Sequence, residues 1–129
     1  MKKEEMYVLD EEDEKVVQLF VELGIPKNVA KTLLYISNVD ECHSAEIEQG
    51  ARLRQPEVSI AIKHMAERGW IEERHVKRNK GKGRPVHVYK LNKPLSSVLD
   101  ELKEDKSREI ESVEKNLQEL ERLLNENKS

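Results

Sequence analysis

The chain has 129 residues, of which 36% are hydrophobic and 38% are charged, and its net charge is −3. A chain of this length supports one domain with one core, and the longest apolar run, residues 33–36, is far too short to cross a membrane. The single cysteine excludes an intramolecular disulfide. Because no secretory signal follows the N-terminal methionine, we expect a cytoplasmic protein.

Apolar residues at helical spacing predict two helices in the first forty residues. The first helix covers residues 10–23, starts with acidic residues and ends at Gly24. Its predicted buried face consists of Val16, Leu19, Phe20 and Leu23. The second helix begins at Pro26 and ends near Asp40. The buried face of this second helix is predicted at Val29, Leu33 and Ile36, flanked by Ala30 and Leu34.

Two further helices are predicted between residues 44 and 68. Ser44 is a favourable N-cap for the shorter one, and the longer one has Pro56 in its first turn and Gly69 after its end. One side of the longer helix collects Val58, Ala61, Ile62 and Met65. Its other side presents Ser59, Ile60, Lys63 and His64. This outward side contains few acidic residues, unlike an ordinary solvated face, and therefore indicates a binding surface.

After Gly69 the periodicity changes from 3.6 to 2, which predicts a β-hairpin with strands over 70–77 and 85–91. In the second strand, His87 is predicted on the inner face as a packing residue, together with Tyr89 and Leu91. The segment 74–93 holds eight lysines and arginines and no acidic residue, inside an otherwise acidic chain. Such a segment is either a solvated basic loop or a surface for a polyanion.

The last predicted element is one long helix over residues 94–127, because no proline or glycine follows Pro94. Aliphatic residues at heptad spacing predict a coiled-coil homodimer through Leu99, Leu102, Ile110, Val113, Leu117, Leu120 and Leu124. A polar stretch at 104–109 interrupts this spacing, so that the first part would pack on the domain and the second on a partner chain. The alternative is an acidic, solvated tail helix.

This order of elements resembles the winged helix-turn-helix regulators of the MarR, ArsR and TrmB type, which are common in archaea and bacteria. The resemblance is carried by four stretches, which are Ser44-Ala45-Glu46-Ile47, residues 54–59, residues 65–71, and Gly83-Arg84-Pro85 ahead of residues 89–91. It implies a mainly α fold with a small β-hairpin. It also implies a winged-helix DNA-binding domain over residues 1–93, with its core at 14–93, and a dimerisation helix over 94–129.

The resemblance further implies a transcription regulator that binds specific double-stranded DNA as a homodimer. The recognition helix would enter the major groove, and the hairpin, or wing, would lie at the adjacent minor groove. The implied contacts of the recognition helix are Arg54, Gln55, Pro56, Ser59, Ile60, Lys63 and His64. The implied contacts of the wing are Lys77, Arg78, Lys80, Lys82 and Arg84. Among the former, Gln55 could pair with adenine and Ile60 could contact a thymine methyl group.

Catalytic motifs are absent from the sequence, since it contains no HExxH, no phosphate-binding loop and no Ser-His-Asp arrangement. We therefore expect neither an enzyme nor a bound cofactor or metal. Cys42 and His43 could form a metal or redox sensor, but such residues beside a strand are more often packed in the fold.

Two other classes of partner are alternatives to DNA. A winged-helix subunit that binds proteins in a transcription or replication assembly is the alternative function. RNA binding is disfavoured because the basic segment lacks stacking aromatic residues. An unidentified small-molecule effector remains compatible with the sequence, and its pocket would lie between the protomers or under the long helix.

Overall fold

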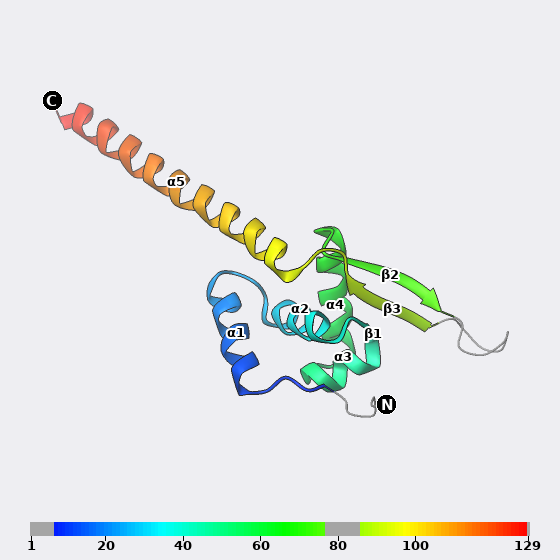
Figure 1. Cartoon of the computed structure of the whole chain (residues 1–129). Helices are drawn as coiled ribbons and strands as arrows, with labels where there is room; N and C mark the ends of the chain where they lie inside the picture. The colour runs from blue at the N-terminus through cyan, green and yellow to red at the C-terminus, as the bar shows by residue number, and fades with distance from the viewer. Residues whose placement is uncertain (1–6, 77–85, 129) are drawn as a thin grey trace. The chain divides into compact units, whose positions relative to one another are not determined.

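The structure, a computed structural model, describes residues 7–76 and 86–128 (Figure 1). The chain divides into two compact units, Met1–Pro94 and Leu95–Ser129. The elements of the first unit are α1 (Glu11–Glu22), α2 (Lys27–Val39), β1 (Glu41–His43), α3 (Ser44–Ala51), α4 (Gln55–Glu67), β2 (Ile71–Val76) and β3 (Val86–Leu91). The second unit consists of α5 (Leu95–Lys128). The predicted mainly α fold with a small β-hairpin and a long C-terminal helix is confirmed, and β1 adds a third strand to the hairpin.

The core of the first unit is built around α2. This helix packs against α1, α3, α4 and the strands β1 and β3, and most of its circumference is buried, as is typical of a central helix. Its buried residues are Val29, Ala30, Thr32, Leu33, Leu34, Tyr35 and Ile36. The predicted face of α2 is therefore confirmed.

The predicted buried face of α1 is only partly correct. Phe20 is buried as expected, but Val17 is buried in place of Val16, and Leu19 and Leu23 are exposed. Val16 lies four residues before Phe20 and Val17 lies three residues before it, so both satisfy helical spacing. The helix α1 packs against α2, and its buried side carries Val17 together with Phe20.

The N-termini of α1 and α3 are fixed by side chains three residues into each helix. At α1, the Asp13 N–H donates to the Asp10 carboxylate and the Asp10 N–H donates to the Asp13 carboxylate, both at 2.9 Å. At α3, the His43 N–H donates to the Glu46 carboxylate at 2.9 Å. The N-cap of α3 is therefore His43 and not Ser44, one residue earlier than predicted.

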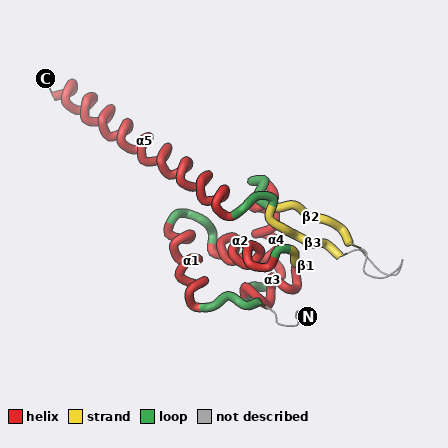
Figure 2. Tube along the Cα trace, viewed as in Figure 1, coloured by secondary structure: helices red, strands yellow, loops and turns green. Residues whose placement is uncertain are grey.

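The three strands form an antiparallel sheet in the order β1-β3-β2. The register places Ile71 opposite Leu91 at one end of the β2–β3 hairpin and His75 opposite His87 near the other. Figure 2 shows β2 and β3 as an adjacent pair that extends away from the helices of the first unit. His87 shares a sheet face with Tyr89 and Leu91, as predicted, but it is exposed rather than packed, because this end of the hairpin lies beyond the core.

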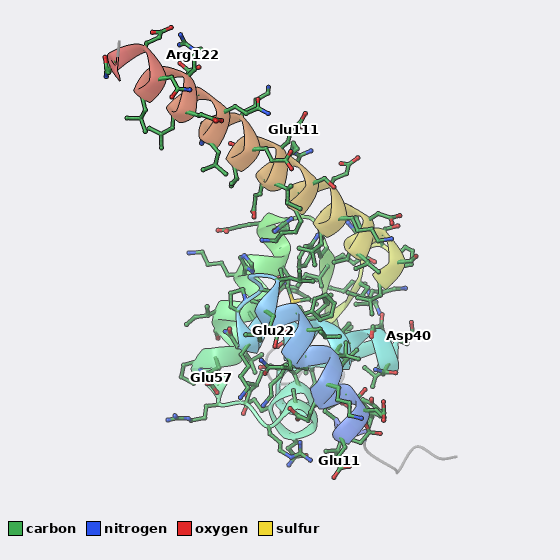
Figure 3. The ribbon with its side chains drawn as sticks, turned by 90° about the vertical axis from the view of Figure 1, so that its left-hand side faces the viewer. Glu11, Glu22, Asp40, Glu57, Glu111 and Arg122 are labelled. Carbon is green, nitrogen blue, oxygen red and sulfur yellow. The ribbon has the colours of Figure 1, made fainter. Side chains whose placement is uncertain are left out.

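The helix α5 has 34 residues and is therefore about 50 Å long. Its polar residues form ion pairs along the helix, among them Arg108 with Asp105 at 2.6 Å and Arg122 with Glu119 and Glu126 at 2.6 and 2.8 Å. Figure 3 shows Glu111 and Arg122 projecting outward from this helix. No helix in residues 7–76 and 86–128 is long and apolar enough to span a membrane.

Candidate nucleic-acid interface

The two ends of α4 are defined by the sequence around it. At the start, the Arg54 N–H donates to the Glu57 carboxylate at 2.8 Å, and the Asn28 side-chain amide of α2 donates to the Glu57 carbonyl at 3.0 Å. At the end, Gly69 adopts φ = 75°, a left-handed conformation that favours glycine. The Trp70 N–H then donates to the Met65 carbonyl at 2.9 Å, which closes the helix in a Schellman turn. Both ends of α4 are thus held in place.

The faces of α4 agree with the sequence-based prediction. Val58, Ala61 and Met65 are buried, and Ile62 is half-buried. The exposed residues on the outward side are Gln55, Pro56, Ser59, Ile60 and Lys63, and the N-cap Arg54 is exposed as well. Ile60 is 63% exposed. The outward face thus combines amide, hydroxyl, aliphatic and cationic side chains on one rigid helix.

His64 differs from the other predicted residues of α4 because it is only half-exposed. Its Nδ1 atom is buried and has no hydrogen-bond partner among the residues that the structure describes. Its ring meets the Trp70 ring edge-on, with 6.4 Å between the ring centroids, and the Arg68 guanidinium covers Trp70 at 4.6 Å from the ring centroid. Unlike Lys63, His64 therefore belongs in part to the packing at the end of α4.

The predicted contacts of the wing, Lys77, Arg78, Lys80, Lys82 and Arg84, lie outside the described residues. In the described part of the hairpin, Arg74 of β2 forms an ion pair with Glu41 of β1. The positive charge of Arg74 is therefore partly balanced within the sheet.

The predicted dimer residues of α5 fall into two groups. Ile110, Val113, Leu117, Leu120 and Leu124 are all at least half-exposed. Leu99 is 41% exposed and Leu102 is 5% exposed. The spacing of 3 and 4 residues places the first group along one side of α5, as a continuous apolar stripe.

The described residues contain one group with the donor atoms of a metal site, Glu73, His75 and His87. The sequence alone did not predict this group, because it is formed by the pairing register of β2 with β3. Two histidines near the facing ends of two predicted strands were the available signal.

Cys42 is buried, and burial together with the carboxylates of Glu46 and Glu41 raises the pKa of its thiol to about 12. The Nε2 atom of the neighbouring His43 lies 3.6 Å from the Glu46 carboxylate at the start of α3. A protonated, buried thiol is a weak metal ligand and a weak nucleophile. The surroundings of Cys42 therefore favour a residue packed in the fold over a metal or redox sensor.

Comparisons with known proteins agree with this geometry. The model of the MarR family matches residues 23–84. A solved structure described as a possible transcriptional regulator from Methanosarcina mazei Go1 superposes with a TM-score of 0.62 at 15% identity, over 82% of this chain and 86% of that one. A MarR family regulator from Neisseria meningitidis matches with a TM-score of 0.48 at 15% identity, over 88% of this chain and 89% of that one. No curated protein matches the sequence.

The M. mazei structure shows that the fold is shared. Regulators of the MarR family are transcription factors and not enzymes, which agrees with the lack of catalytic motifs in this sequence. The match over residues 23–84 makes this chain similar to the regulators of the MarR family, and its first unit has a winged-helix fold.

Proposed function

We propose that this protein is a transcription regulator that binds specific double-stranded DNA as a homodimer, with α4 in the major groove and the β2–β3 hairpin at the adjacent minor groove. The observation that carries the proposal is the exposed face of α4 with its polar and aliphatic side chains. The major groove of B-form DNA is about 12 Å wide and admits an α-helix. Because α4 is fixed at both ends, little conformational entropy of its backbone is lost when its side chains bind base edges.

The exposed residues of α4 divide into two roles in this proposal. Gln55 offers both a donor and an acceptor, which suits the edge of adenine, and Ile60 offers an aliphatic surface for the methyl group of thymine. Lys63 and Arg54 offer positive charge for phosphates, which position the protein without reading sequence. Pro56, Ser59 and His64 complete the predicted contacts of the recognition helix, with His64 limited by its partial burial.

The basic segment 74–93 supports the placement of the hairpin at the duplex. Its five predicted wing contacts carry five positive charges in a chain of net charge −3. Cations that neutralise phosphates release counterions, so the logarithm of the affinity falls with the logarithm of salt by about 0.9 per phosphate contact. DNA binding by this protein should therefore depend strongly on salt.

The apolar stripe of α5 supports the homodimer. Five aliphatic residues exposed along one side of a long helix are unusual for a monomer. A second copy of the same stripe would cover them, since a two-fold dimer pairs a surface with itself. Two recognition helices in such a dimer would meet half-sites about 34–36 Å apart.

The test begins with selection of bound duplexes from a random pool, followed by affinity measurements over a range of salt concentrations. The triple variant K80A/K82A/R84A removes three cations of the wing, and K15A/R108A/K115A removes two lysines and one arginine elsewhere as a matched control. We expect the wing variant to weaken binding and to reduce the salt slope by about 2.7 per protomer, while the control keeps both values close to wild type. Equal affinity and slope for the wing variant and wild type would contradict the proposal.

Two variants of α4 separate its two roles. We expect Q55A to relax the base preference at one position of each half-site, and K63A to weaken binding to all duplexes by a similar factor. A protein that selects no duplex at all, and instead binds another protein, would favour the alternative of an assembly subunit. The cytoplasmic location and the small-molecule effector stay predictions.

A further inference from the structure

Three side chains capable of binding a metal gather on one face of the β2–β3 hairpin. Glu73 and His75 are two residues apart on β2 and therefore share a face, and His87 of β3 lies directly opposite His75. The two imidazole rings stack with their centroids 4.3 Å apart. The Glu73 carboxylate contacts Nδ1 of His87 and lies 3.6 Å from Nε2 of His75. One donor atom from each residue lies within 4.8 Å of the others.

The chemistry of this group matches one kind of ligand. Two imidazole nitrogens and one carboxylate oxygen form the donor set of three-ligand zinc sites, in which water takes the fourth position. Imidazole also suits nickel and copper, whereas magnesium and calcium prefer oxygen ligands. When both histidines are neutral the group carries a charge of −1, which favours a divalent cation.

The sheet keeps the nearest described cations away from this group. Side chains alternate between the two faces of a strand, so Arg74, next to both Glu73 and His75, lies on the opposite face. There it forms its ion pair with Glu41. Lys90 pairs with Glu72 in the register and also occupies that opposite face. Among residues 7–76 and 86–128, the cations closest in sequence therefore leave the Glu73 carboxylate to the two histidines on its own side.

All three side chains are exposed, and they are free of the packing that would prevent small rotations. The rings of His75 and His87 need such rotations, because the lone pairs of stacked rings point side by side and must converge on one ion. Exposed side chains change rotamer readily. The backbone register, which sets the separation of the ligands, requires no change.

We propose that Glu73, His75 and His87 form a binding site for a divalent transition-metal ion of the zinc type, at the outer end of the β2–β3 hairpin. Because the ligands come from both strands, a bound ion would cross-link β2 to β3 one residue before β2 ends and one residue after β3 begins. Residues 77–85, which contain the predicted wing contacts, connect these two ends. This site is separate from the DNA-contacting face of α4, and its test requires no DNA.

The test is calorimetric titration of the full-length protein, free of any histidine tag, with ZnCl₂ at pH 7.5. The variants E73Q, H75N and H87N each remove one ligand. E72Q is the matched control, because Glu72 is a neighbouring glutamate on the opposite face of the same strand. H43N is a second control, because it removes a histidine that is also paired with a glutamate.

We expect wild type, E72Q and H43N to bind one zinc ion per chain. Each of E73Q, H75N and H87N should bind at least about tenfold more weakly, since even the loss of an outer partner of a metal ligand costs about 10–100-fold in affinity. Circular dichroism checks that each variant is folded. Wild-type affinity in the double variant H75N/H87N, or no zinc binding by the wild-type protein, would overturn the proposal.

A second measurement avoids substitutions altogether. In the wild-type protein labelled with ¹⁵N, one equivalent of zinc should shift the imidazole resonances of His75 and His87 and leave those of His43 and His64 in place. Shifts confined to His43 would overturn the site. If Glu73 serves only as an ion-pair partner of the two histidines, zinc should leave the imidazole resonances of His75 and His87 unchanged.

Discussion

The apolar stripe of α5 yields a prediction whose magnitude follows from exposure. Leu117 is 61% exposed, and its replacement by alanine removes three carbon atoms, worth about 2.4 kcal/mol if fully buried in a dimer. Multiplied by the exposed fraction of Leu117, this value gives a loss of about 1.5 kcal/mol of dimerisation free energy for each substituted chain. Because a homodimer contains two copies, L117A should weaken dimerisation by about 3 kcal/mol, which raises the dissociation constant roughly 100-fold.

Sedimentation equilibrium over a dilution series measures this effect directly. Alanine favours helix formation, so weaker dimerisation in L117A cannot be ascribed to loss of α5, and circular dichroism confirms the helix. Q118A is the matched control, because the adjacent Gln118 faces away from the stripe and its replacement should leave the dissociation constant close to wild type. A dissociation constant for L117A within threefold of wild type, or a monomeric wild-type protein at micromolar concentration, would refute the role given to the stripe.

Three further predictions concern the described fold. A Cβ atom on Gly50 would lie 2.0 Å from the Tyr35 ring, so G50A should destabilise the protein by about 1–3 kcal/mol despite the roughly 1 kcal/mol gain in helix propensity. An unchanged midpoint of thermal unfolding would contradict this prediction, and Q49A, at an exposed position of the same helix, serves as the control. The pKa of Cys42, about 12, keeps its thiol protonated at pH 8, so a disulfide reagent should modify it readily in urea and only slowly in the native protein. Zinc at about 100 times its dissociation constant should raise the free energy of unfolding by about 2.7 kcal/mol, and should have no such effect on H75N/H87N.

The helical core shows where sequence periodicity is sufficient and where it is not. In α2 every residue of the predicted face is buried, and the structure also buries Thr32 and Tyr35, which the predicted face did not include. In α1 two overlapping sets of apolar residues satisfy the same spacing, and only burial in the folded unit distinguishes Val17 from Val16. Tertiary contact thus decides between faces that local spacing treats as equal.

The candidate sites show a similar division. The outward face of α4 was predictable because Pro56 and Gly69 fix the ends of the helix and the buried residues fix its rotation. The exposure of His87 was not predictable, because alternation assigns a residue to a face but does not show how far the core extends along the strand. The cluster around Glu73 depends on the register of two strands, which the sequence of either strand alone does not determine.

Trp70, at the end of α4, gives this protein an internal reporter. It is the single tryptophan of the chain. Its buried ring is covered by the guanidinium of Arg68, directly after α4, and meets the ring of His64, in the last turn of α4, edge-on. Indole fluorescence is sensitive to nearby charges and to solvent. The intrinsic emission of the unlabelled protein therefore comes from one known position, and a change in its intensity or wavelength when a duplex is added reads out events at the end of α4.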